Sequence, residues 1–256
     1  MKINKKAPLV CTVLIGAITL LSSGCKSYND VAAHYSSKHI KANTNQVTAQ
    51  IPETGELGYI LISLTDVGNN DTSLINKNTA YYKEVSKQFA AFKNHKVVKQ
   101  LNEDLKEDAA NFTHFRNGLY AFKFNERNRM VLKSDYRIDL NRVDFRRYIS
   151  GIQDFIEKSK FREFYAQHNN LYTKLIQNER QQLTMNAAWA SMGKHYTEPF
   201  QSYQVILSPL MKGYSSSLAI SGRGFRECLI FTESTNKALL YSAANAKPST
   251  KGSYND

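Results

Sequence analysis

The sequence predicts an α+β domain with a helical middle and a small mixed sheet near its C-terminal end. Between residues 79 and 175, apolar side chains recur at three- and four-residue spacing, which is typical of amphipathic helices. After Trp189 they form short runs of strand character that are separated by Gly and Pro. A run of helices followed by a run of strands favours the α+β class.

The N-terminal residues form a basic start, an apolar run from Leu9 to Leu21, and then Ser22-Ser23-Gly24-Cys25. This order predicts a secretory signal peptide over residues 1–24. The apolar run is too short to span a bilayer, which needs about twenty residues. The ending resembles the lipobox of bacterial lipoproteins, although Ser22 replaces the usual Leu. We therefore expect Cys25 to carry lipid and to become the mature N-terminus.

Lipidation of Cys25 predicts a protein of the cell envelope that is anchored by several acyl chains such as palmitate. Secretion without lipid and an uncleaved anchor are the alternatives. Lys26 replaces the Asp that retains some lipoproteins at the inner membrane, which favours the outer membrane. Removal of the three signal lysines lowers the formal net charge from +12 to +9. A basic exported protein is expected to face anionic lipid or polysaccharide and not nucleic acid.

The cysteines exclude an intramolecular disulfide in the mature chain. Cys11 leaves with the signal peptide and Cys25 takes lipid, so Cys228 stands alone. Its apolar neighbours predict a strand, in which Cys228 is a small buried hydrophobic residue and not a nucleophile.

Composition divides the mature chain into three parts. Residues 25–55 are rich in Ser, Asn, Lys, Thr and Ala without apolar periodicity, which predicts a flexible tether. Residues 56–241 are expected to form a single α+β domain. Residues 242–256 are small and polar and are expected to be a disordered tail. The first predicted strand is the apolar run from Gly58 to Leu64, which precedes an Asp- and Asn-rich loop.

Apolar stripes predict five helices in the middle of the chain. The first begins at Thr79 and the fifth at Ser159, which is expected to be its N-cap. The segment 122–124 could instead be extended. The stripes are Tyr81, Val85, Phe89 and Phe92; Val97, Val98, Leu101 and Leu105; Phe112, Phe115, Leu119 and Phe122; Val143, Tyr148, Ile149, Ile152, Phe155 and Ile156; and Phe161, Phe164, Tyr165, His168, Tyr172 and Leu175.

Three strands are expected after the helices. Residues 203–207 form an apolar run that Pro209 ends, and residues 217–220 and 227–232 form two more. Gly222 and Gly224 lie between the last two runs and predict a turn.

No catalytic or metal-binding motif is present in the sequence. Zinc hydrolases commonly carry His-Glu-x-x-His on a helix, and none of the six histidines has that spacing. His34 and His39 fall in the expected tether, and His168 lies on an aromatic stripe that predicts a packing role. His195 lies in a loop and has no visible partner.

Other reactive-looking segments have ordinary structural explanations. Gly213-Tyr214-Ser215-Ser216-Ser217 lacks the second glycine of a nucleophile elbow and is expected to be a turn. Arginines at positions 137, 142, 146 and 147 could grip a polyanion. Acidic residues run through the same stretch, so a salt-bridged, solvated helix is the favoured interpretation.

Several segments in order resemble a family of uncharacterised bacterial proteins, many of them lipoproteins, that are predicted to be zinc metallopeptidases. The resemblance covers about residues 57–232. It comprises the apolar run 58–64, Tyr82-Lys83-Glu84-Val85 with Phe89, Lys93-Asn94-His95 with Val98, Phe164-Tyr165 with Tyr172, Tyr203 to Leu210, and Gly224 to Cys228.

The resemblance implies a zincin-like scaffold whose His-containing metal motif would follow the sheet. That motif is absent here, because no histidine follows His195. We therefore expect a truncated, inactive peptidase-like lipoprotein, with zinc only if the missing motif exists. A scaffold that has lost catalysis is the other explanation of the missing motif. The alternative function is a non-catalytic envelope lipoprotein that binds a protein or glycan. His95 matches the family pattern but is expected to be structural.

Overall fold

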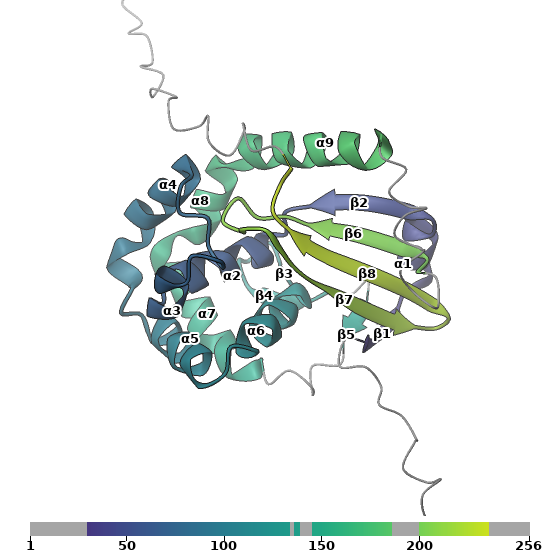
Figure 1. Ribbon diagram of the computed structural model, residues 1–256. Helices are drawn as coiled ribbons and strands as arrows, with labels where there is room; N and C mark the ends of the chain where they lie inside the picture. Colours follow the sequence, from purple (N-terminus) through teal and green to yellow (C-terminus); the bar gives the residue numbers. More distant parts are fainter. Residues whose placement is uncertain (1–29, 134–135, 139–144, 186–199, 236–256) are drawn as a thin grey trace, which may run out of the picture.

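The computed structural model describes residues 30–133, 136–138, 145–185 and 200–235. Most of the helices gather on one side of a mixed sheet (Figure 1), which confirms the α+β prediction. The helices are α1 (Ser37–Asn43), α2 (Glu53–Leu64), α3 (Asp66–Asn70), α4 (Ala80–Phe89), η1 (Ala90–Phe92), α5 (Lys96–Glu107), α6 (Asn111–Tyr120), α7 (Arg146–Ser159), α8 (Phe161–Gln167) and α9 (Asn169–Met185). The strands are β1 (Asp30–Tyr35), β2 (Gln46–Gln50), β3 (Phe122–Phe124), β4 (Met130–Leu132), β5 (Tyr136–Ile138), β6 (Ser202–Ile206), β7 (Tyr214–Gly222) and β8 (Phe225–Thr232).

The main sheet has the strand order β2-β6-β8-β7-β1-β5. Strands β2, β6 and β8 are parallel to one another, and β7 returns antiparallel to β8. Strand β1 then runs parallel to β7, and β5 pairs antiparallel with β1 at the edge. Strands β3 and β4 form a separate antiparallel pair. The sheet therefore joins the two ends of the described chain.

The N-terminal segment corrects one prediction. Residues 30–50, expected to lie in a flexible tether, form β1, α1 and β2 of the folded domain. The polar composition of this segment predicted a flexible chain, but β2 is stabilised by pairing with β6, which is distant in the sequence. Its register places Val47 opposite Tyr203 and Ala49 opposite Val205. The sheet is accordingly larger than the C-terminal strands alone would make it.

Helix α2 corrects a second prediction, since residues 58–64 were expected to be a strand. Every residue from Glu56 to Leu64 is buried, so α2 is apolar on all sides and shows no helical period. Glu53 and Glu56 lie in its first turn, where the helix dipole favours negative charge. A short apolar run of this kind does not distinguish a buried strand from a buried helix.

The remaining helices confirm most of the stripe predictions. Thr79 caps α4 by accepting a hydrogen bond from the Tyr82 amide, and the segment 122–124 is extended as β3. Ser159 is not an N-cap, because it lies in the last turn of α7 with its hydroxyl buried. The chain turns at Lys160, whose φ of 55° is left-handed, and α8 and α9 replace the single helix expected there.

The C-terminal strands confirm the predicted runs and the turn between them. Arg223 and Gly224 have φ of 51° and 72°, and they join β7 to β8 in a tight hairpin. The inward face of the sheet contributes Leu218, Ile220, Leu229 and Phe231 to the main core. The outward face carries a smaller cluster of Phe200, Tyr203 and Cys228.

Candidate functional site

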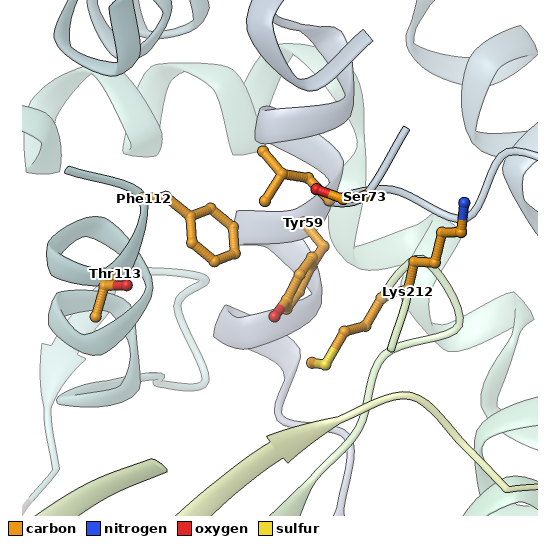
Figure 2. A pocket seen from close by; sticks show the side chains of 7 residues that line it. Tyr59, Ser73, Phe112, Thr113 and Lys212 are labelled. Carbon is orange, nitrogen blue, oxygen red and sulfur yellow. The ribbon is translucent and has the colours of Figure 1, made fainter. Parts of the chain in front are cut away.

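A cleft of about 260 Å³ opens between α2, α6 and the segment that follows β6. Figure 2 shows Tyr59 of α2 beside Phe112 of α6, with Lys212 across the opening. The cleft is lined by Tyr59, Ser73, Leu74, Phe112, Thr113, Met211 and Lys212. A bridge between Ile75 and Met211, and a hydrogen bond of 2.8 Å from the Asn76 amide to the Leu210 carbonyl, hold two of its walls together.

The lining of the cleft combines apolar surface with a cation. Phe112 and Tyr59 meet edge to face, with ring centroids 6.2 Å apart. Lys212 is exposed, and its ammonium group donates one hydrogen bond of 2.6 Å to the Thr72 carbonyl. An ammonium group has three N–H donors, so two others remain for a ligand. This chemistry suits a small ligand with an apolar part and an anionic group.

Glu56 lies one helical turn before Tyr59 and is completely buried. Neither of its carboxyl oxygens accepts a hydrogen bond from the described residues. Burial raises the pKa of Glu56 to about 7, and the nearby hydroxyls of Ser208 and Tyr81 offset part of this rise without reaching hydrogen-bond geometry. The carboxyl group is therefore neutral over most of the acidic range.

Three tyrosines surround this carboxyl group from α4, α8 and α9. The hydroxyls of Tyr81 and Tyr172 lie 2.6 Å apart, and Tyr165 donates to the Ile51 carbonyl at 2.6 Å. Burial, followed by the charge of Glu56, raises the pKa of all three phenols above the usual range. The three phenols therefore stay protonated at neutral and acidic pH, and they pack the helices around α2.

A second buried carboxyl group, Glu227 of β8, lies on the inward face of the sheet. Its Oε2 accepts hydrogen bonds from Ser202 Oγ at 3.1 Å and from Gln204 Nε2 at 2.6 Å. The Nε2 atom of His39 lies 3.2 Å from the same oxygen. The three donors come from β6 and α1, and the other oxygen has no partner among the described residues.

Further hydrogen bonds extend this network into the helical layer. The Tyr120 hydroxyl donates to Gln204 Oε1 at 2.7 Å, and Gln50 Nε2 donates to Tyr120 at 3.0 Å. Tyr35 stacks on His39, and its hydroxyl donates to the Ile220 carbonyl at 3.1 Å. Glu227 has no exposed surface. The network therefore joins α1, the sheet and α6.

The structure places two of the other candidate histidines, His95 and His168, in packing positions. His95 caps α5, lies 3.0 Å from Asp154 and packs on Phe92 and Phe155. His168 packs among Tyr81, Phe164 and Tyr172, as its stripe predicts. His34 is exposed on β1. His195 lies outside the described residues.

The remaining sequence candidates are also accounted for. Cys228 forms no disulfide within the described residues and is 1% exposed within β8, which confirms the buried-hydrophobe interpretation. Ser216 lies in β7 and accepts a hydrogen bond of 2.6 Å from Arg116, so the serine-rich segment is largely strand and not turn. Arg147 of α7 forms an ion pair of 3.1 Å with Asp104 of α5, whereas Arg137 lies in strand β5 and Arg142 lies outside the described residues. The expected single salt-bridged helix over this stretch is therefore wrong. Cys25 and the tail 242–256 lie outside the described residues.

The described part of the chain does not bring together three side chains that could hold a metal ion. His39 with Glu227, His95 with Asp154 and His168 with Glu84 each supply two ligands at most. A structural or catalytic zinc site needs three or four protein ligands. The residues present in the described part therefore do not fit the zinc that the resemblance implies.

Sequence reasoning missed Glu56, Glu227 and the cleft. Glu56 was overlooked because the run after it was interpreted as a strand, which left it in a loop. Glu227 had a detectable signal, since Ser202 and Gln204 are polar at alternate positions of an otherwise apolar strand. The cleft residues come from four separate segments, and no local pattern joins them.

Comparisons with models of protein families, with curated proteins and with solved structures gave no match for this chain.

Proposed function

We propose that this chain is a lipid-anchored lipoprotein of the bacterial cell envelope, whose domain binds an anionic segment of an envelope partner. The observation that carries the anchor is the N-terminal pattern, in which three lysines and an apolar run precede Ser22-Ser23-Gly24-Cys25. No helix of the described residues is long and apolar enough to cross a bilayer. Attachment to the membrane would then depend on Cys25.

Metabolic labelling with an alkyne analogue of palmitate tests the anchor. The wild-type chain is expected to incorporate the label and to sediment with membranes, because two or more acyl chains give a stable anchor. The variant Cys25→Ser should lose both properties, whereas Cys228→Ser, which changes a buried thiol, should retain them. Equal labelling of wild type and Cys25→Ser would contradict the proposal.

The cleft supports the binding part of the proposal. It combines the apolar surface of Leu74, Phe112 and Met211 with the Lys212 ammonium group. The formal net charge of +9 that remains after removal of the signal lysines also favours an anionic partner. The ligand would insert an apolar group beside Phe112 and pair a carboxylate or phosphate with Lys212.

Calorimetric titration tests the cleft with two probes, a carboxylate-bearing peptidoglycan fragment and an acidic peptide. Binding of either probe supports the proposal if Lys212→Glu abolishes it and Lys87→Glu, a charge reversal on the exposed side of α4, does not. Thr113→Trp should also block binding by filling the cleft. Failure of both probes, or binding unaffected by Lys212→Glu, would count against it.

The peptidase alternative depends on the resemblance alone. It proposes a zincin-like scaffold whose catalytic helix is absent from this chain. Sequencing beyond the codon for Asp256 and measuring the zinc content of the purified mature chain test it together. A histidine-bearing helix in the continued reading frame would support the alternative, and a stop codon with no bound zinc would end it.

A further inference from the structure

We propose that the domain lies directly on the bilayer, with the edge formed by β1 and β5 facing the lipid and with α9 facing away. This inference rests on the proposed lipidation of Cys25. It follows from the number of residues between Cys25 and the first described strand. This link is much shorter than the tether over residues 25–55 that the sequence predicted.

The reach of the anchor is limited by the chain. Strand β1 begins at Asp30, five residues after Cys25. Five residues span at most about 17 Å when fully extended. The start of β1 must therefore stay within about 17 Å of the membrane surface, whatever conformation the intervening residues adopt.

The sheet is wide enough for this limit to decide which of its edges can face the membrane. Four strand spacings separate β1 from β2 in the order β2-β6-β8-β7-β1-β5. At about 4.8 Å for each spacing, β2 lies roughly 19 Å from β1. Helix α9 contacts β2 and lies beside it (Figure 1). An orientation with β2 and α9 against the bilayer would raise Asp30 beyond the reach of the anchor.

The sequence places basic residues on β5 and at the start of α7. Strand β5 is the outermost strand, and its register places Arg137 opposite His34 of β1. Arg146 and Arg147, at the start of α7, are exposed and follow β5 closely in the sequence. Basic residues close to an anionic surface are attracted to it. The β1 and β5 edge is therefore the surface nearest to the anchor.

Fluorescence quenching in proteoliposomes tests the orientation. The acylated protein is placed in vesicles of phosphatidylethanolamine and phosphatidylglycerol that carry a nitroxide quencher on the headgroup. A fluorophore is attached at His34→Cys on β1 or at Gln181→Cys on α9, both exposed positions, while Cys228 is buried. Quenching at position 34 is expected to exceed quenching at position 181 severalfold.

Lengthening the anchor provides the matched control. Insertion of about fifteen Gly and Ser residues after Lys26 gives a flexible tether with a mean span of roughly 24 Å, and the difference between the two positions should largely disappear. Equal quenching with the native spacing, or stronger quenching at position 181, would overturn the inference. Mass spectrometry of the same sample separates this outcome from failure of the lipoprotein proposal, because a chain without acyl groups overturns both.

Discussion

Two buried carboxyl groups, Glu56 in the helical half and Glu227 in the sheet, are accommodated in different ways. Glu56 accepts no hydrogen bond from the described residues, and burial raises its pKa to about 7. Glu227 collects three donors on one oxygen, from His39, Ser202 and Gln204. The first group is stabilised by taking up a proton and the second by a network of hydrogen bonds. The two sites should therefore respond differently to mutation and to pH.

The largest effect is expected at Glu227. Replacement by Leu leaves His39, Ser202 and Gln204 without their common acceptor in a fully buried position. Each buried donor that is left without an acceptor costs about 1–3 kcal/mol, and this variant leaves several. Urea denaturation followed by circular dichroism measures the free energy of unfolding. Glu163→Leu on the exposed surface of α8 is the control and should change it little. A near-native stability of Glu227→Leu would show that the network is weak.

The next effect, at Glu56, depends on pH. The carboxyl group titrates near pH 4.5 in the unfolded chain and near pH 7 in the folded protein. Between these values the folded state holds a proton that the unfolded state has lost, so stability falls as the pH rises and stays low above pH 7. The total loss is roughly 3 kcal/mol.

The variant Glu56→Gln removes this titration. Its stability should lack the decline between pH 4.5 and pH 7, so relative to wild type it gains up to about 3 kcal/mol over that interval. Chemical denaturation at a series of pH values measures the difference, with the exposed Glu163→Gln as a matched control. A parallel decline in wild type and Glu56→Gln would exclude Glu56 as its source.

An intermediate effect is expected at Gly222, which holds β1 close to β7. A Cβ atom at this position would lie 1.7 Å from the Ala33 carbonyl oxygen. Gly222→Ala must displace β1 and should cost about 1–3 kcal/mol. Because β1 leads into α1, the contact of His39 with Glu227 should loosen as well. Faster hydrogen exchange over residues 30–43 would show this, whereas Gly55→Ala, with only ordinary contacts at its Cβ, should leave exchange there unchanged.

The smallest effect is expected at the exposed Arg147, which pairs at 3.1 Å with the buried Asp104. The Arg147 side chain is 42% exposed, so water and salt screen the pair. Arg147→Gln should therefore lower the free energy of unfolding by less than about 1 kcal/mol. Denaturation at low and high salt measures this difference. If Arg147→Gln lost as much stability as Glu227→Leu, the greater burial of the contacts at Glu227 would not explain the size of its effect.

Periodicity predicted those parts of the fold whose faces differ in polarity. Helix α5 buries Val97, Val98 and Leu101 and exposes its opposite side, and its stripe was visible in the sequence. Periodicity failed for α2, because burial on every side removes the contrast between faces. It also failed for β1 and β2, whose pairing partners are distant in the sequence.

The candidate sites were less predictable than the fold. Two carboxyl groups and a cleft depend on contacts between segments far apart in the chain, such as the 188 positions between His39 and Glu227. Local spacing carries no information on such pairs. The N-terminal pattern is different, because a signal peptide acts as a linear sequence before the chain folds.

The proposed anchor is tested most directly by mass spectrometry of the N-terminal peptide from membrane-extracted protein. A lipid-anchored protein should yield a peptide that begins at Cys25 and carries fatty acyl groups. A peptide that retains Met1 to Gly24, or an unmodified Cys25 at the mature N-terminus, would contradict it.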